Sequence, residues 1–312
     1  MRFAFIKCHG SGNDFPLIDA RTLDLSDTEW AGVARALADR AGPVGGDGLL
    51  LLTAGDDAGH DFGMRMFNSD GSEAETCLNG LRCTARLGFE LLGLDSARVR
   101  LKTSSAEVAR AEPLLPGVVT IRETAGPAST RTADVGLRVT AETVIDEPIP
   151  GLPSPRAFTA IAMPNPHLVT FVESVDEAEL VAVGDWCEAG PALIPARANV
   201  SFVEVRGQDL FVRTYERGVG LTDSCGSAMA SSVYAAGRTG RVPFGTVMKV
   251  FNKGGLVMGS SDPDGMVTIR GNATFLYDAS IEVDPVTATA EPPLVHARRE
   301  DEAAAWAAAT PA

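Results

Sequence analysis

The sequence lacks the features of membrane proteins and of nucleic-acid-binding proteins. No apolar run reaches about 18 residues, the length that a helix needs to cross a bilayer. The N-terminus meets Lys7 and His9 before an apolar core of signal-peptide length can form, so we expect a cytoplasmic protein. Lysine and arginine number 27 against 41 aspartates and glutamates, and the net charge of −14 argues against non-specific nucleic-acid binding.

Cysteine and histidine are also scarce, and their spacing matches no common cofactor site. The five cysteines and four histidines show no metal-ligand spacing, and the nearest cysteines, Cys77 and Cys83, have five residues between them. An odd and sparse set of cysteines is typical of a reduced cytoplasmic protein. The glycine cluster at 45–48 precedes no Gly-Lys-Ser/Thr, and no strand–GxGxxG–helix order occurs, so we expect neither a phosphate loop nor a dinucleotide site.

What the chain does contain is a cysteine at the predicted start of a helix. Residues 65–82 are typical of a strand end, a polar glycine loop and a helix. Apolar residues at steps of three and four predict the helix: Leu81, Ala85, Phe89 and Leu92. The predicted start and stop signals are Ser72, Glu73, Thr76 and Gly93. Unpaired N–H groups and the helix dipole favour a thiolate, so we expect a lowered pKa for Cys77.

The same pattern occurs a second time. Arg65 and Cys77 are twelve positions apart, and so are Arg213 and Cys225, again with an aromatic residue and a glycine loop between them. Small or apolar residues then follow at helical spacing: Ala228, Met229, Ser232, Val233 and Ala236. Two such cysteines in two matching halves predict two thiols that face one another across a cleft.

The length of 312 residues suits two domains of ordinary size. Residues 123–138, rich in Thr, Ala, Gly and Pro, are the predicted boundary. We therefore expect an N-terminal half at 1–125, which a closing strand near 274–285 completes, and a C-terminal half at 126–273. Residues 286–312 are expected to be a mobile tail or a lone helix. Two further helices are predicted by capping boxes, one at Ser26 with Glu29 and one at Ser174 with Glu177.

Several segments together resemble the diaminopimelate epimerase family. Each segment is weak evidence by itself, but they occur in the family's order over roughly residues 1–285: Gly10–Phe15, Asn68–Cys77, Asn79–Gly80, Pro164–His167, Ala198–Val200, Tyr215–Gly220 and Cys225–Ser227. The resemblance implies an α/β (α+β) fold of two pseudo-symmetric domains, each a small mixed β-barrel around a central helix. It also implies cofactor-independent conversion of LL- to meso-diaminopimelate in lysine biosynthesis, no metal, no nucleic-acid or membrane partner, and it is compatible with a homodimer.

The chemistry explains why such an enzyme needs two thiols. Inverting an α-carbon requires one group that removes a proton from one face and another that delivers a proton to the opposite face. By resemblance, these two groups are Cys77 and Cys225. The remaining residues that the family resemblance assigns fall into three sets. The distal end of the substrate is held by Asn13, Asn68, Asn165, Asn199 and Arg217; the reacting centre is flanked by His167 and Glu216, which bind the α-ammonium group and assist thiol ionisation; and the α-carboxylate is bound by Asn79, Gly80, Gly226 and Ser227.

Some residues depart from the family pattern and leave alternatives open. Leu78 stands where glycine is common, Leu221 where glutamate is frequent, and Ala228–Met229 where a small pair is usual. These positions bear on substrate preference, so a racemase of another amino acid on the same fold is one alternative. A thiol redox or binding protein with a Cys77–Cys225 disulfide is another, although no Cys-x-x-Cys motif is present. We interpret Cys8, Cys83 and Cys187 as structural.

Overall fold

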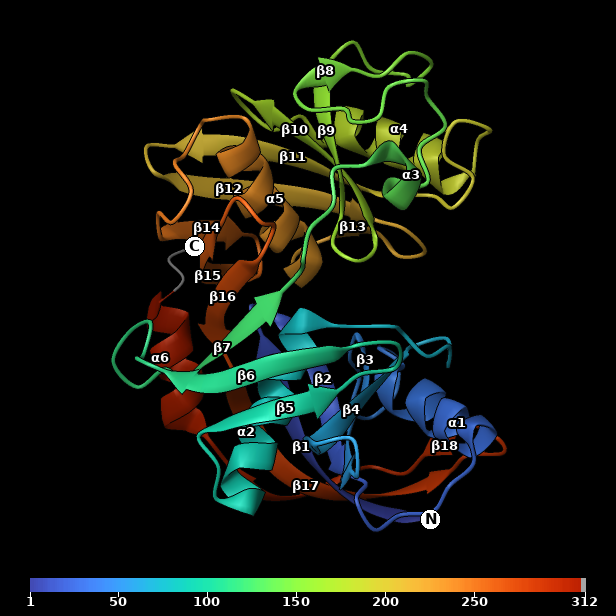
Figure 1. Ribbon diagram of the computed structural model, residues 1–312. Coiled ribbons are helices and arrows are strands. Elements are labelled where there is room, and N and C mark those ends of the chain that lie inside the picture. The colour runs from blue at the N-terminus through green and yellow to red at the C-terminus, as the bar shows by residue number, and fades with distance from the viewer. Residues whose placement is uncertain (310–312) are drawn as a thin grey trace. The chain divides into compact units, whose positions relative to one another are not determined.

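The structure is a computed structural model that describes residues 1–309. Its internal contacts divide the chain into two compact units, Met1–Glu123 with Arg270–Ala312, and Thr124–Ile269. Two strands, β7 (Thr120–Ala125) and β16 (Val267–Asn272), carry the chain from one unit into the other (Figure 1). No helix among the described residues is long and apolar enough to cross a membrane.

In the first unit, six strands wrap around helix α2 (Leu78–Leu92), which contacts every one of them (Figure 1). The pairs β1–β2, β3–β4 and β5–β6 are antiparallel, whereas β2–β3 and β4–β5 are parallel. Because strands surround it, α2 is buried on all sides from Leu78 to Phe89. The six strands are β1 (Arg2–Gly10), β2 (Asn13–Asp19), β3 (Gly48–Asp56), β4 (His60–Asn68), β5 (Ser96–Arg100) and β6 (Ser105–Ala111).

The second unit repeats this connectivity around helix α5 (Gly226–Arg238). The pairs β9–β10, β11–β12 and β14–β15 are antiparallel, and β10–β11 and β12–β14 are parallel, in the same order along the chain. The expectation of two pseudo-symmetric mixed α/β halves, each around a central helix, is therefore confirmed. The strands are β9 (Ala157–Ala162), β10 (Pro166–Val172), β11 (Asn199–Arg206), β12 (Asp209–Glu216), β14 (Met248–Asn252) and β15 (Gly255–Ser261), with smaller elements α3 (Thr132–Val135), β8 (Glu147–Pro148) and β13 (Gly220–Thr222).

Each unit also has a helix at the same place, between its second and third strands. Helix α1 (Asp27–Ala38) begins with the predicted capping box, in which the Ser26 hydroxyl accepts from the Glu29 N–H and the Glu29 carboxylate accepts from the Ser26 N–H. Helix α4 (Glu177–Glu188) corrects our second prediction. Its N-cap is Asp176, whose carboxylate accepts from two backbone N–H groups, so the helix begins later than a Ser174 cap would require.

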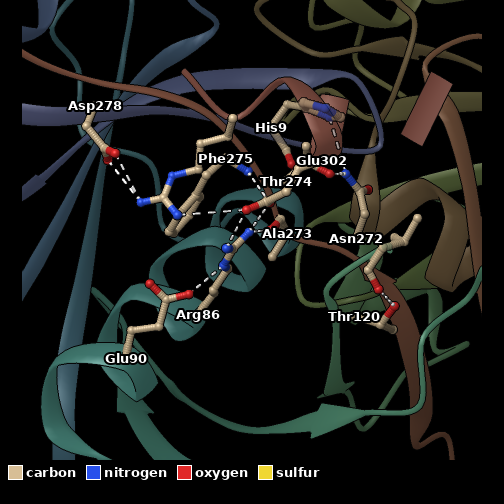
Figure 2. Close-up of polar contacts among 12 residues, drawn as sticks. His9, Arg86, Glu90, Thr120, Asn272, Ala273, Thr274, Phe275, Asp278 and Glu302 are labelled. Carbon is tan, nitrogen blue, oxygen red and sulfur yellow. Dashed lines mark hydrogen bonds and ion pairs between the residues drawn. The ribbon is translucent and has the colours of Figure 1, made fainter. Parts of the chain in front are cut away.

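The closing strand expected near 274–285 is present, and the segment after it, expected to be a mobile tail or a lone helix, contains two strands and a helix within the described residues. Strand β17 (Thr274–Asp284) pairs with β1, and β18 (Thr289–Ala290) and β19 (Leu294–Arg298) pair with β17. Helix α6 (Glu300–Ala309) follows, with Trp306 buried beside His9. Glu302 accepts from the guanidinium of Arg86 on α2, and this ion pair ties α6 to the first unit (Figure 2). The last residues of the expected tail, 310–312, lie outside the described part of the chain.

Candidate active site

Cys77 lies at the entrance to the central helix of the first unit. It is the N-cap of α2, and its sulfur accepts from the N–H of Gly80 at 3.3 Å. The loop signals Ser72, Glu73 and Thr76 do not cap the helix, because α2 begins only at Leu78. A Cβ at residue 80 would lie 2.6 Å from Leu50 Cδ2 and 3.3 Å from the Cys77 sulfur, so a larger residue would have to displace the Leu50 side chain. The structure thus places the thiol against a helix N-terminus, as the sequence predicted.

Two asparagines adjoin this thiol. Asn13, at the start of β2, presents its side-chain Oδ1 to the Cys77 sulfur at 3.8 Å and to Asn79 Nδ2 at 3.4 Å. Asn79 is almost fully buried, in the first turn of α2. Asn68, which the resemblance groups with Asn13, bonds through Nδ2 to the Ser72 hydroxyl of its own loop. The first half-site therefore combines Asn13, Cys77, Asn79 and Gly80.

The loop before each cysteine is braced by the arginine that the sequence pattern singled out. Arg65 pairs with Glu73, within the loop that leads to Cys77, and with Asp27. Arg213, which is nearly buried, donates to the carbonyl oxygen of Thr222 at 2.8 Å in the loop before Cys225. In this respect the twelve-residue spacing corresponds to a shared structural role, in which a cation on a strand holds the loop that positions the thiol.

Cys225 occupies the corresponding place in the second unit. It is the N-cap of α5 and lies 3.5 Å from the Ser227 hydroxyl. Burial and the neighbouring Glu216 raise the pKa of the Cys225 thiol well above its usual value, against smaller lowering effects from Ser227 and from the Ala228 N–H. The thiol form of Cys225 therefore dominates at neutral pH.

A chain of polar contacts links Cys225 to most of the other predicted residues of this unit. From Ser227 it runs to Asn165 Nδ2 at 3.3 Å, and from Asn165 Oδ1 to His167 Nε2 at 3.1 Å. Asn199 continues it, since its Nδ2 lies 3.3 Å from His167 Nε2 and its Oδ1 accepts from the Arg217 N–H at 2.9 Å. The structure thus brings together residues of β10, β11 and α5 and two residues beside strands, Asn165 and Arg217, that are far apart in sequence.

His167 lies in this chain of contacts as a neutral ring. Its ring is fully buried, and burial together with Arg217 lowers its pKa to about 3. No described residue bonds to its Nδ1. A neutral imidazole can accept a proton but brings no positive charge to the site. Glu216 accepts from the Thr222 hydroxyl at 2.6 Å and hydrogen-bonds Cys225, and Arg217 donates to the carbonyl oxygen of Ala196 at 3.3 Å.

The two half-sites share one contact. In each, an asparagine at or just before the second strand of the unit contacts the residue two positions after the cysteine: Asn13 with Asn79, and Asn165 with Ser227. They differ at the sulfur, because the N–H of Gly80 donates to Cys77, whereas Cys225 caps α5 without a side-chain hydrogen bond of this kind. The duplication therefore extends to the asparagine beside each thiol.

The residues that depart from the family pattern occupy three different environments. Leu78 is buried and its carbonyl accepts from Arg82, Met229 is buried with its sulfur 3.1 Å from Asn252 Nδ2, and Leu221 is 37% exposed. Cys8, Cys83 and Cys187 are fully buried, away from either helix N-terminus. All five cysteines are reduced, and no group of three or more metal-ligating side chains gathers within residues 1–309.

Three functional neighbours were not found from the sequence. Asp47 accepts from Asn13, and Arg82 donates to Asn79 within a buried pair with Glu123. Arg82 stands between Leu81 and Cys83, on the part of the helix whose neighbours are predicted to be buried, and this was an available signal, since arginine is rarely buried without a partner. No sequence signal marks Asp47 or Glu123, because only the pairing of distant strands brings them to the site.

Comparisons with known proteins agree with this geometry. A family model described as diaminopimelate epimerase matches residues 5–110 and 159–276. The chain is 37% identical to a diaminopimelate epimerase of Clostridium acetobutylicum, over 89% of this chain and 85% of that protein. It is 35% identical to one of Listeria innocua, over 91% and 90% of the two chains.

Solved structures share the fold at low sequence identity. A predicted epimerase from Pseudomonas aeruginosa has a TM-score of 0.64 at 18% identity, covering 90% of this chain and all (100%) of that one. A hydroxyproline epimerase from Agrobacterium vitis, solved with bound trans-4-hydroxy-L-proline, also has a TM-score of 0.64, at 13% identity over 92% and 94% of the chains.

Proposed function

This chain belongs to the diaminopimelate epimerase family and is an epimerase that acts on diaminopimelate, and we propose that Cys77 and Cys225 are the two acid–base groups of its reaction. The observation that supports this assignment is the duplicated setting of the thiols. Each is the N-cap of the central helix of its unit, and in each an asparagine from another segment contacts the residue two positions after the cysteine. No other cysteine of the chain has this setting.

At the start of each turnover, one of the two cysteines would be a thiolate and the other a thiol. The high pKa of Cys225 keeps its proton on sulfur, whereas the N–H of Gly80 can stabilise a thiolate at Cys77. In one direction, the Cys77 thiolate takes the α-proton and becomes a thiol, while Cys225 gives its proton to the opposite face of the carbon. The pair then holds the reverse protonation states, ready for the reverse reaction. No cofactor enters this proton balance.

We assign the other residues by their chemistry. The N–H groups at the starts of α2 and α5, including Gly80, Gly226 and Ser227, would face the negative charge that develops on the α-carboxylate. Glu216, beside Cys225, would pair with the α-ammonium group. Arg217 is the one residue with a cationic side chain in the contact chain formed by Ser227, Asn165, His167, Asn199 and Arg217. It would bind the distal carboxylate, assisted by Asn165 and Asn199. Asn13, Asn68 and Asn79 would complete the site.

Further parts of the proposal concern the cellular setting. Five reduced cysteines suit a cytoplasmic enzyme of lysine and peptidoglycan precursor synthesis, since the cytoplasm keeps thiols reduced. The absence of nucleic-acid partners and the formation of a homodimer stay predictions.

The test is proton NMR in heavy water with LL-diaminopimelate and, separately, meso-diaminopimelate. We expect loss of the α-proton signal together with conversion between the isomers. Cys77→Ser and Cys225→Ser should each abolish conversion, because each removes one of the two proton carriers. Cys83→Ala is the matched control, since this cysteine lies on the same helix as the Cys77 cap but inside it, and conversion should persist.

Two results would contradict the proposal. Conversion by either serine variant at the rate of the unaltered enzyme would remove that cysteine from the mechanism. Turnover of another amino acid with no exchange in either isomer of diaminopimelate would move the enzyme to a different racemase activity on the same fold.

A further inference from the structure

The amide of Asn79 has its orientation set by Arg82. Arg82 is completely buried, and its Nη2 donates to Asn79 Oδ1 at 2.7 Å. A guanidinium has five N–H donors and no acceptor, so it can bond only the oxygen end of the amide. The nitrogen end of Asn79 is therefore turned toward Asn13, whose Oδ1 it approaches at 3.4 Å. Glu123 holds the guanidinium from the other side, with Oε1 2.6 Å from Nη1.

Asn13 is oriented in the same way by Asp47. The Asp47 carboxylate accepts from Asn13 Nδ2 and also from the N–H of Asp14 at 2.9 Å. An ionised carboxylate only accepts, so it can bond only the nitrogen end of the Asn13 amide. The oxygen end then faces Cys77. Arg82, Asn79, Asn13 and Asp47 form one directed chain, from a buried cation to a carboxylate.

This direction matters for Cys77 because the two forms of a thiol need opposite partners. Asn13 Oδ1, 3.8 Å from the sulfur, can accept from S–H but repels a thiolate. The Gly80 N–H, 3.3 Å from the same sulfur, donates and favours the thiolate. With the amide turned the other way, both neighbours would donate, and the thiol would lose much of its proton affinity. A residue that must alternately hold and release a proton needs one partner of each kind.

We propose that Asp47 and Arg82 are positioning residues, which act through Asn13 and Asn79 to keep an amide oxygen against the Cys77 thiol and so prevent it from being locked as a thiolate. The inference rests on the proposed role of Cys77, but its central measurement does not depend on turnover. Asp47 is itself held from outside by Arg40, which also pairs with Asp14, and Asp14 in turn pairs with the nearly buried Lys7.

The measurement is the pKa of Cys77 by itself. Iodoacetamide reacts with thiolates, and the half-buried Cys77 is reachable, so its alkylation rate between pH 5 and pH 10 reports its ionisation. Mass spectrometry of the peptide that contains Cys77 separates its labelling from that of the buried cysteines. Four proteins are compared: the unaltered enzyme, Asp47→Ala, Asn13→Ala and the double variant.

Asp47→Ala should lower the pKa of Cys77 by about 1 unit, because Asn13 is then able to turn its nitrogen end toward the sulfur. The same substitution also removes a negative charge, which would lower the pKa in any background. In the Asn13→Ala background there is no amide to turn, so the effect of Asp47→Ala should shrink to a small charge effect. An equal fall in both backgrounds would overturn the proposal, and so would no fall in either.

Failure of the proposed function would look different. If Cys77 were not a catalytic residue, epimerisation would survive Cys77→Ser, whereas the effect of Asp47→Ala on the alkylation of Cys77 would still depend on Asn13. If only the positioning were wrong, Cys77→Ser would abolish turnover, and the effect of Asp47→Ala on the alkylation of Cys77 would be the same with and without Asn13.

The Arg82 end of the chain has its own test. Arg82→Met should lower kcat/KM strongly in the unaltered enzyme and only slightly in an Asn79→Ala background, since the arginine acts through that amide. Arg86→Met is the matched control. Arg86 lies one turn further along α2, is nearly buried and is ion-paired with Glu302 and Glu90 (Figure 2). Its hydrogen bonds go to Glu90, Ala273 and Glu302 and not to Asn79. The loss of kcat/KM caused by Arg86→Met should be the same in the unaltered enzyme and in the Asn79→Ala variant. Equal losses for Arg82→Met in the two backgrounds would leave it a merely structural residue.

Discussion

Replacing Glu123 by glutamine should change how the stability of the protein depends on pH. Glu123 is completely buried, one carboxylate oxygen accepts from Arg82, and the other has no partner among the described residues. Burial raises its pKa from 4.5 to about 7, although Arg82 opposes the shift. The folded protein therefore holds this proton more tightly than the unfolded chain does.

The sign and size follow from that difference. Below pH 4.5 the carboxyl group is protonated in both states, and its full contribution to stability is present. As the pH rises from 4.5 to about 7, the unfolded chain loses this proton while the folded state keeps it, so stability falls, and the loss is complete once the pH has passed about 7. At 1.36 kcal/mol per unit, the total loss is about 3 kcal/mol. Glutamine carries no titrating proton, so the Glu123→Gln variant should lack this loss.

The assay is urea unfolding of both proteins at intervals from pH 4 to pH 8. The free energy of unfolding of the unaltered protein, minus that of the variant, should fall by about 3 kcal/mol across the range. Glu302→Gln is a control of opposite sign, because hydrogen bonds and charge from Arg86 lower the pKa of Glu302, and its contribution is lost as the pH falls. A difference between unaltered protein and Glu123→Gln that stays constant with pH would refute the reasoning.

Two further substitutions test the packing and the loop before Cys225. Gly184→Ala should destabilise the second unit by about 1–3 kcal/mol, because the new Cβ would lie 2.2 Å from Tyr215 Cγ, and thermal melting would measure it. An unchanged melting temperature would mean that α4 moves away from β12 at little cost. Arg213→Met should lower kcat more than it raises KM, since the loop before Cys225 loses its brace at the Thr222 carbonyl, and steady-state kinetics with LL-diaminopimelate would show the split. A normal kcat would make that arginine dispensable for positioning the thiol.

Local patterns predicted the elements around the thiols well. The helix after Cys77 ends at Gly93, which adopts the left-handed conformation that glycine permits, and the Ser26 capping box forms as predicted. These features depend on residues a few positions apart, which is why the sequence reveals them. The Ser174 box failed because Asp176, two residues later, caps α4 with two hydrogen bonds. The choice between two local caps depends on where the helix packs.

The partners of Asn13 and Arg82 were not accessible from the sequence. Asp47 lies 34 positions from Asn13, and Glu123 lies 41 positions from Arg82, so no local spacing relates them. The contacts of the last segment could not be predicted for the same reason. Its alanines and charges resemble a solvated segment, but Glu302 finds Arg86 at a separation of 216 positions and Trp306 is buried beside His9.

The sequence alone determined that the chain is a duplicated protein with a cysteine at the start of each central helix, and its motifs placed it beside one enzyme family. A repeated spacing and a helical period are properties of the chain itself, so they can be read before folding. Only the tertiary structure decided which atoms face each thiol. The direction of the Asn13 amide and the raised pKa of Cys225 arise from charges and burial that distant strands bring together, and these physical effects have no counterpart in the order of the residues.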